Sequence, residues 1–261
     1  MELQPIIISA GLAIGVLIGF TGMGGGGALM TPFLILTRVR PSVAVGTDFP
    51  QMMFTKFFGT WQHHHWGSVN YRLVLPIISG SLQGAFLGVV LLVVLRDNLG
   101  VSMDVFLTGV LGGILTLVGI VLLFRLLLRR WLPHRLESWE GLSLDGKGSL
   151  LLTGLGVSVG LVMGITSVGY GTLLIVILTV LFRVFMRTIM GTNVPHSAIF
   201  TSGAGTMHLG FGNVGLVLAA NTLVGSIPGV VMGSRLTAQV PERGLRAVVA
   251  LALMVVGLKL P

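Results

Sequence analysis

The chain of 261 residues is 53% hydrophobic and only 9% charged, and its mean hydropathy is +0.97. Soluble domains carry about 25% charged residues, so this composition excludes a soluble globular protein. A bilayer core offers no water to backbone groups, which leaves only helices or a closed barrel. The apolar runs exceed the ~10 residues of a barrel strand and do not alternate strictly, which favours helices.

The net charge of +8 comes from Lys and Arg that cluster between the apolar runs. This distribution is typical of cytoplasmic loops facing anionic lipid, and it argues against nucleic-acid binding. The chain contains no Cys, which excludes disulfides and thiolate metal sites.

Apolar runs fill most of the chain, and the first begins close to the N-terminus. Residues 1–10 lack the basic region of a signal peptide and lead directly into a long apolar segment, so we expect a retained helix. Five runs are followed, after a charged stretch, by five more of similar rhythm. The runs are 5–20, 27–37, 42–60, 72–95 and 104–127, then 149–165, 172–182, 190–206, 215–235 and 245–260.

The two sets of runs also repeat each other in sequence. Moving the chain along itself by 145 positions aligns residues 19–88 with 164–233 without a gap. A register that matches Arg, His and Pro as well as Gly predicts an internal duplication. The matched pairs include Gly19 and Gly164, Arg38 and Arg183, Pro50 and Pro195, His63 and His208, and Gly80, Ser81, Gly84 and Gly88 with Gly225, Ser226, Gly229 and Gly233.

The duplication divides the chain into a first half, residues 1–124, a linker, residues 125–148, and a second half, residues 149–261. The linker carries five Lys and Arg residues. By the positive-inside rule, we expect it in the cytoplasm.

The short runs 27–37 and 172–182 allow two arrangements of the halves. As helices they are roughly 16 Å long, too short to cross a ~30 Å bilayer core. If each forms a hairpin with the preceding run, each half crosses three times and the halves are inverted. If the two runs make one broken crossing, each half crosses four times and the halves are parallel. Inversion places eleven loop Lys and Arg inside and four outside, against seven and eight for the parallel case, which favours inversion.

The Gly-rich stretch between runs 5–20 and 27–37 predicts a helix break, because each Gly costs about 1 kcal/mol relative to Ala. A break in the membrane exposes backbone N–H groups and a helix N-terminus, which favour an anion. Close helix packing is the alternative explanation for Gly, and we assign it to the motifs that begin at Gly84 and Gly156. Matched breaks in two halves indicate a midplane substrate site. Its predicted residues are Thr21, Gly24, Gly25, Gly26, Thr166, Ser167, Gly169 and Tyr170.

The segments Gly46-Thr47-Asp48 and Gly191-Thr192-Asn193 are matched polar positions at the starts of apolar runs. Capping of a helix N-terminus is the first interpretation, and such a helix start could also aim its positive dipole end at an anion. Thr47, Thr192 and Asn193 therefore join the predicted substrate-binding residues. Asp48 has a carboxylate where the second half has an amide, and an ionisable group near apolar sequence is a candidate for proton coupling.

Lys56 lies inside the run 42–60, where it either snorkels to the interface or balances the charge of an anion, so it is a further substrate-binding candidate. Residues 63–65 are three consecutive His that point in different directions on a helix, which argues against a metal site. Only His63 has a repeat partner, His208. Both are candidates for proton coupling near neutral pH, with a loop or interface role as the alternative.

No nucleophile–base arrangement, ATP-binding loop or cofactor fingerprint stands out in the sequence. We therefore expect neither an enzyme nor a bound cofactor. The driving force for transport would be an ion gradient or the substrate gradient itself.

Four segments carry a resemblance to a known family. They are the Gly-rich opening Gly19-Phe-Thr-Gly-Met-Gly-Gly-Gly-Gly-Ala-Leu-Met-Thr-Pro-Phe-Leu, Ala44-Val-Gly-Thr47, the Gly67-x-Val69-Asn70 turn and the helix from Gly80 to Gly88. The chain resembles the TauE/SafE family of sulfite, sulfonate and sulfoacetate permeases over nearly its whole length. The second half departs from the four consecutive Gly of the first, with Gly169-Tyr170-Gly171 in their place. The two halves of the predicted site therefore differ in shape.

We expect an all-α polytopic membrane protein with two homologous, inverted halves and Gly-broken short helices. The resemblance implies export of a small anion, sulfite or a C2 organosulfonate such as sulfoacetate. From the broken helices we expect alternating access driven by an ion gradient, in the cell inner membrane. Its expected partners are the anion and the lipid bilayer, with a homodimer left open. The alternative is an integral-membrane enzyme or assembly factor of sulfur or lipid metabolism.

Overall fold

A computed structural model describes residues 4–21, 27–65, 71–99, 102–128, 146–168, 174, 186–236 and 242–260. Every regular element within these ranges is an α-helix, which confirms the predicted all-α fold. The helices are α1 (Pro5–Thr21), α2 (Gly27–Leu36), α3 (Pro41–His65), α4 (Tyr71–Leu99), α5 (Met103–Leu128), α6 (Gly146–Thr166), α8 (Met186–Gly210), α9 (Leu216–Leu236) and α10 (Glu242–Lys259).

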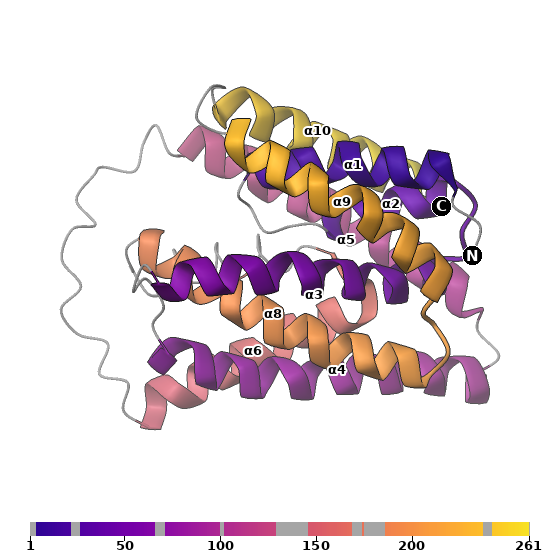
Figure 1. The fold of residues 1–261 in the computed structure, drawn as a ribbon. Helices are drawn as coiled ribbons and strands as arrows, with labels where there is room; N and C mark the ends of the chain where they lie inside the picture. The colour runs from indigo at the N-terminus through magenta and orange to yellow at the C-terminus, as the bar shows by residue number, and fades with distance from the viewer. Residues whose placement is uncertain are drawn as a thin grey trace.

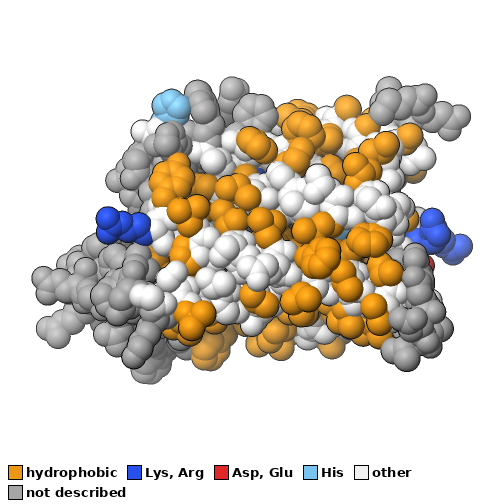
Figure 2. Space-filling model, turned by 90° about the horizontal axis from the view of Figure 1, so that it is seen from below, with side chains coloured by type: hydrophobic (Ala, Val, Ile, Leu, Met, Phe, Trp, Pro, Cys, Tyr) orange, Lys and Arg blue, Asp and Glu red, His pale blue; other side chains and the backbone are white. Residues whose placement is uncertain are grey.

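The molecule is built to sit in a membrane. Its long helices lie side by side with their axes running across the view of Figure 1. In the described part of the chain, four segments are long and apolar enough to span a bilayer: Tyr71–Leu95, Asp104–Phe124, Gly148–Thr166 and Leu216–Gly233. Figure 2 shows a face rich in hydrophobic side chains, with Lys and Arg at its two ends. Lipid covers such a face without penalty, so the fold is that of a polytopic membrane protein.

Glycine residues bring α1 against α9 and α4 against α6, so each half lends its first helix to the other half. A Cβ atom at Gly15 would collide with the backbone of Ser226, and one at Gly160 with the backbone of Ser81. Small residues let helix backbones approach this closely in membranes. The prediction that the motifs beginning at Gly84 and Gly156 serve helix packing is confirmed, because these two glycines lie in the α4–α6 contact.

Helices α5 and α10 pack in opposite directions. Gly112 of α5 lies against Gly257, whereas Gly119, two turns further along, lies against Ala250 and Met254. Each of α5 and α10 is the last helix of its predicted half. Antiparallel packing of two corresponding helices is the arrangement that inverted halves require.

The loop between α8 and α9 explains one motif of the sequence. Gly212 has a φ of 71°, and its N–H donates to Leu209 O while the N–H of Asn213 donates to His208 O. These two bonds form a Schellman motif, in which a left-handed residue closes the end of a helix. Gly212 is the repeat partner of Gly67, so the Gly-x-Val turn of the second half ends α8.

The predicted short run 27–37 is confirmed as α2, a helix of ten residues that follows the end of α1 at Thr21. Its counterpart, 172–182, lies outside the described residues except for Leu174. The boundaries predicted for the halves and the linker stay predictions.

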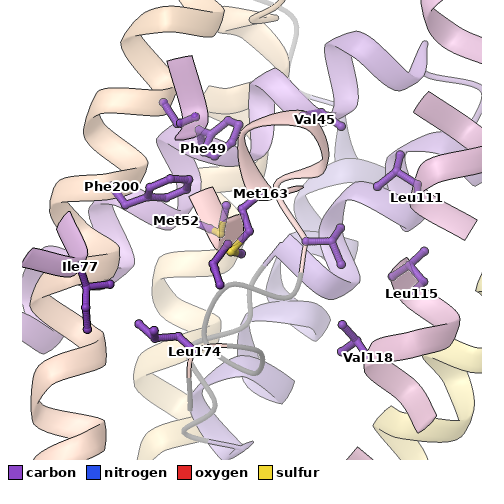
Figure 3. Close-up of a cluster of buried hydrophobic side chains, with 14 of the residues drawn as sticks. Val45, Phe49, Met52, Ile77, Leu111, Leu115, Val118, Met163, Leu174 and Phe200 are labelled. Atoms are coloured by element: carbon purple, nitrogen blue, oxygen red, sulfur yellow. The ribbon is translucent and has the colours of Figure 1, made fainter. Parts of the chain in front are cut away.

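The main hydrophobic core lies where both halves meet. It draws side chains from α3, α4, α5, α6, α8 and α10. Figure 3 shows Phe49 and Met52 of α3 close to Phe200 of α8 and Met163 of α6, and the rings of Phe49 and Phe200 have centroids 6.3 Å apart. Helix α3 is therefore held in the interior from both halves, and the polar residues along it are buried with it.

Candidate functional site

The candidate site is built on α3, whose first half is almost entirely buried among α2, α5, α8 and α9. The capping interpretation of Thr47, Asp48, Thr192 and Asn193 is wrong. Helix α3 begins at Pro41 and α8 at Met186, so these residues lie in the second turn, where the backbone N–H groups already have helical partners. Their burial requires another explanation.

Asp48 forms a compact polar cluster with residues from two other elements. Its Oδ2 atom accepts a hydrogen bond of 2.8 Å from Thr31 Oγ1 of α2 and one of 3.2 Å from Ser167 Oγ. The two hydroxyl oxygens lie 2.8 Å from each other. All three side chains are essentially inaccessible to solvent. The cluster joins α2 and α3 of the first half to the end of α6 in the second.

Ser167 ends α6 in a strained conformation. Its φ is 57°, a left-handed value that is unfavourable for a residue with a Cβ atom, while its N–H still donates to Met163 O over 2.8 Å. Thr166 donates to Val162 O and accepts a long bond of 3.4 Å from the N–H of Val168. The predicted helix break in the second half is confirmed. Strain of this kind is often maintained at functional sites.

Several polar atoms in the first halves of α3 and α8 are buried without a partner in the described part of the chain. Among them are Asp48 Oδ1, both side-chain amide atoms of Gln51, Thr192 Oγ1 and Asn193 Oδ1. Gln51 follows Asp48 by three residues and so lies beside it on α3. Each buried polar atom without a protein partner needs an explanation, and a role in binding a ligand, an ion or water is one.

Lys56 is the buried cation of α3, with 6% of its surface exposed. It follows Met52 by one turn and therefore shares the face of α3 that meets the hydrophobic core. Among the described residues its ammonium group has neither an ion-pair nor a hydrogen-bond partner. Snorkelling to the interface and balancing the charge of an anion both stay predictions for this residue.

His208 stabilises the end of α6. Its Nε2 lies 2.8 Å from Gly164 O, and its ring stacks on Phe49 with centroids 5.0 Å apart. Cationic or donor groups at a helix C-terminus satisfy the last carbonyls. The role of His208 in proton coupling stays a prediction. The side chain of His63, which occupies the matched position in the repeat, lies outside the described residues.

The structure brings together only some of the predicted substrate-binding and proton-coupling residues. Asp48 and Ser167 meet directly, and Thr47 Oγ1 accepts a bond of 3.0 Å from the N–H of Gly215 in the α8–α9 loop. Several predicted substrate-binding positions lie outside the described residues: the side chain of Thr21, and Gly24, Gly25, Gly26, Gly169 and Tyr170. No group of His, Cys, Asp and Glu that could hold a metal occurs among the residues searched, which are the described ones.

Sequence reasoning missed Thr31, Gln51 and His196. The Nε2 atom of His196 lies 2.9 Å from Ser81 Oγ of α4. The repeat held a signal for two of them, because Gln51 and His196 occupy matched positions three residues after Asp48 and Asn193. Polar residues at matched positions within apolar helices mark a shared site. Thr31 had no such signal, because its repeat partner is Val176.

Comparison with known proteins agrees with this fold. The family model described as sulfite exporter TauE/SafE matches residues 7–260. The chain belongs to the TauE/SafE family. It is 38% identical, over 97% of its own length and 98% of the relative's, to the probable membrane transporter protein YjnA of Bacillus subtilis (strain 168). Its identity to the probable membrane transporter protein YdhB of the same organism is 25%, over 98% and 99% of the two chains.

No solved structure is significantly similar to the chain. The TauE/SafE assignment and the helical fold make the protein a polytopic membrane protein of a transporter family.

Proposed function

We propose that this TauE/SafE protein is a secondary carrier that exports a small anion across the cell inner membrane by alternating access, driven by an ion gradient. Sulfite and C2 organosulfonates such as sulfoacetate are the proposed substrates. The observation that carries the proposal is Lys56, a cation buried in a central helix without a described partner.

An unpaired charge in a membrane helix is expensive. Insertion scales give about 2.5–3.5 kcal/mol for a Lys at the centre of a helix. Such residues persist where they face an interior path and meet an opposite charge. Because no described residue supplies that charge to Lys56, an anionic substrate is the partner that we assign to it.

Buried polar groups elsewhere on α3 and α8 also support an oxyanion. Gln51 and Thr192 offer buried N–H and O–H donors without described partners. Sulfite and sulfonates have several acceptor oxygens around one sulfur atom, so one cation and a few neutral donors would match them. The description of the family as sulfite exporters points to the same class of substrate.

The helix arrangement supports a carrier. Helix α6 breaks at Ser167, and α1 is separated from the short α2. Broken helices in repeated halves place a substrate site between parts that can rock against each other. The antiparallel packing of α5 and α10 is consistent with inverted halves.

The first test is thermal stabilisation of the purified protein by a panel of sulfite, sulfate, thiosulfate, taurine, sulfoacetate and simple carboxylates. A ligand that binds only the folded state stabilises it by about 2.7 kcal/mol at 100 times its Kd. We expect a selective shift for sulfite or sulfonates in the wild type, and its loss in Lys56→Gln.

The matched control is Lys259→Gln, which removes a charge from the exposed last turn of α10. This variant should keep the wild-type shift. An equal shift in Lys56→Gln and in the wild type would remove Lys56 from the site. No shift with any anion on the panel would contradict the proposed substrate class.

A further inference from the structure

We propose that Asp48 is the site at which the carrier binds its coupling proton, and that this proton closes a hydrogen-bonded ring of Asp48, Thr31 and Ser167. The inference rests on the proposed carrier function and adds the coupling ion to it. The ring joins α2 and α3 to the broken end of α6. Binding of the proton therefore changes a contact between the two halves of the protein.

The number of protons in the cluster is the first argument. Asp48 Oδ2, Thr31 Oγ1 and Ser167 Oγ form a triangle with sides of 2.8, 3.2 and 2.8 Å. Each side is short enough for a hydrogen bond, so three protons are needed to satisfy all three sides. The two hydroxyl groups supply only two. With Asp48 ionised, one pair of oxygen atoms faces each other without a proton between them.

A third proton on Asp48 completes the triangle. The carboxyl group then donates to one hydroxyl, that hydroxyl donates to the other, and the second hydroxyl donates back to Oδ2. Each oxygen atom gives one hydrogen bond and accepts one. The ionised carboxylate, in contrast, accepts from both hydroxyls and leaves the 2.8 Å contact between Thr31 and Ser167 as two facing lone pairs.

The geometry favours a proton over a metal cation. Protein oxygens coordinate hard cations at about 2.0–2.6 Å and usually in sets of six or more. The cluster offers one carboxylate and two hydroxyls, which are fewer oxygen ligands than such a set requires, and hydrogen bonds account for all three separations between its oxygens. A single proton fits between two such atoms.

The second oxygen of Asp48 indicates where the proton enters. Asp48 Oδ1 is buried and has no partner in the described part of the chain, and Gln51 presents two further amide atoms without partners one turn away. The proton reaches the carboxylate from this polar side. On the return step it leaves the carboxyl group toward the same side. Atoms and charge balance, since one proton binds one carboxylate and the same proton leaves it.

The connection to transport lies in Ser167. This residue holds the end of α6 in a left-handed turn, and its side chain reaches Asp48 across the boundary between the halves. Loss of the proton breaks one side of the triangle at this turn. The end of α6 then loses its hydrogen bond to Thr31 of α2, and in this way the proton gradient biases the movement of one half against the other.

Few other titratable groups face this site. On the elements packed around α3, the described candidates are His196 and His208 of α8 and Asp104 of α5, with Lys56 on α3 itself. His208 is bound to Gly164 O, His196 lies beside Ser81, and Asp104 Oδ1 accepts from the N–H of Ser42. Helix α2 has no titratable residue, and those of α6 and α9 are Lys147 and Arg235, close to the helix ends remote from the cluster.

Infrared difference spectroscopy of the purified protein between acidic and alkaline pH tests proton binding without any substrate. We expect the wild type to show, beyond the signals of its other Asp and Glu residues, one carboxylic-acid C=O band that is absent in Asp48→Asn. Thr31→Val, which keeps the carboxyl group but opens the ring, should keep the band and shift its pH midpoint. Asp104→Asn is the matched control, and it should leave the band of Asp48 in place. A band that persists in Asp48→Asn would overturn the assignment.

Transport in proteoliposomes tests the coupling. The probe is radiolabelled sulfoacetate, whose two acidic groups stay ionised near neutral pH. In the wild type, an imposed pH gradient should accelerate the net flux of sulfoacetate. Asp48→Asn should still exchange internal for external sulfoacetate, but the pH gradient should no longer accelerate its net flux. Two results with folded Asp48→Asn protein would overturn the coupling role: a response to the pH gradient like that of the wild type, or loss of exchange. Absence of exchange in the wild type would refute the carrier function, while the infrared band still decides whether Asp48 binds a proton.

Discussion

Three residues of this protein have a backbone conformation or a burial that is energetically unfavourable for their type. Ser167 has a left-handed backbone, Asp48 is buried within a triangle of oxygens, and Lys56 is buried without a described partner. Each arrangement costs free energy that packing elsewhere must offset. Because three such residues lie on or beside one helix, we propose a functional site there.

The strain at Ser167 predicts a difference between two small substitutions. Both Ser167→Gly and Ser167→Ala remove the hydroxyl, but only glycine adopts a φ of 57° without penalty. We expect Ser167→Gly to be more stable than Ser167→Ala by about 1 kcal/mol, measured from denaturant or thermal unfolding in detergent.

The same two substitutions at Ser158, an exposed residue within α6, provide the control. There the order should reverse, because glycine inside a helix is less stable than alanine by about 0.5–1 kcal/mol. The same order at both positions would contradict the assigned backbone strain.

The sequence predicted Ser167 as a substrate-binding residue, because polar residues at a repeated break stand out. It predicted Asp48 as a proton-coupling candidate, because a carboxylate near apolar sequence is expensive. It did not predict that they touch, since Asp48 and Ser167 belong to different halves. The capping hypothesis for Thr47 and Asp48 failed for a physical reason: Pro41 is well suited to a first helical turn, so α3 starts upstream of Gly46, where a cap would require it to begin.

At the scale of the helices, glycine decides which pairs form. Gly11 and Gly15 of α1 meet the backbone of α9, and Gly156 and Gly160 of α6 meet that of α4. In lipid, helices associate through close backbone packing rather than through a hydrophobic driving force. A stripe of glycine on both partners is therefore the main determinant of each pair.

Two glycines of α6 test this point. Gly160→Leu would place a side chain against the backbone of Ser81, whereas a Cβ atom added at Gly154 of the same helix would meet no other atom within 4 Å. We expect Gly160→Leu to lose about 3 kcal/mol or more of stability. Gly154→Leu should be neutral or slightly more stable, because Leu favours helix over Gly. The readout is the yield of monodisperse protein in detergent and its melting temperature.

A folded Gly160→Leu protein with wild-type stability would contradict the close contact between α4 and α6. The sequence predicted that the motifs beginning at Gly84 and Gly156 serve packing. It did not predict that they pack against each other, because a glycine motif gives the face of a helix but not the partner of that face.

At the scale of the whole molecule, the two halves are interlocked. Helix α1 packs on α9 and α6 on α4, so neither half contains the main partner of its own first helix. The repeat in the sequence shows which helices correspond, and the lengths of the runs predicted most of the helices. The exchange of helices between halves has no signature in hydrophobic periodicity, which is why only the structure revealed it.

The flux of radiolabelled sulfoacetate through proteoliposomes, measured against concentration, tests the carrier most directly. We expect a flux that saturates, is stimulated by unlabelled anion on the opposite side, disappears in Lys56→Gln and survives in Lys259→Gln. A flux that rises linearly with concentration, or that equals the leak of protein-free vesicles, would contradict the proposed carrier function.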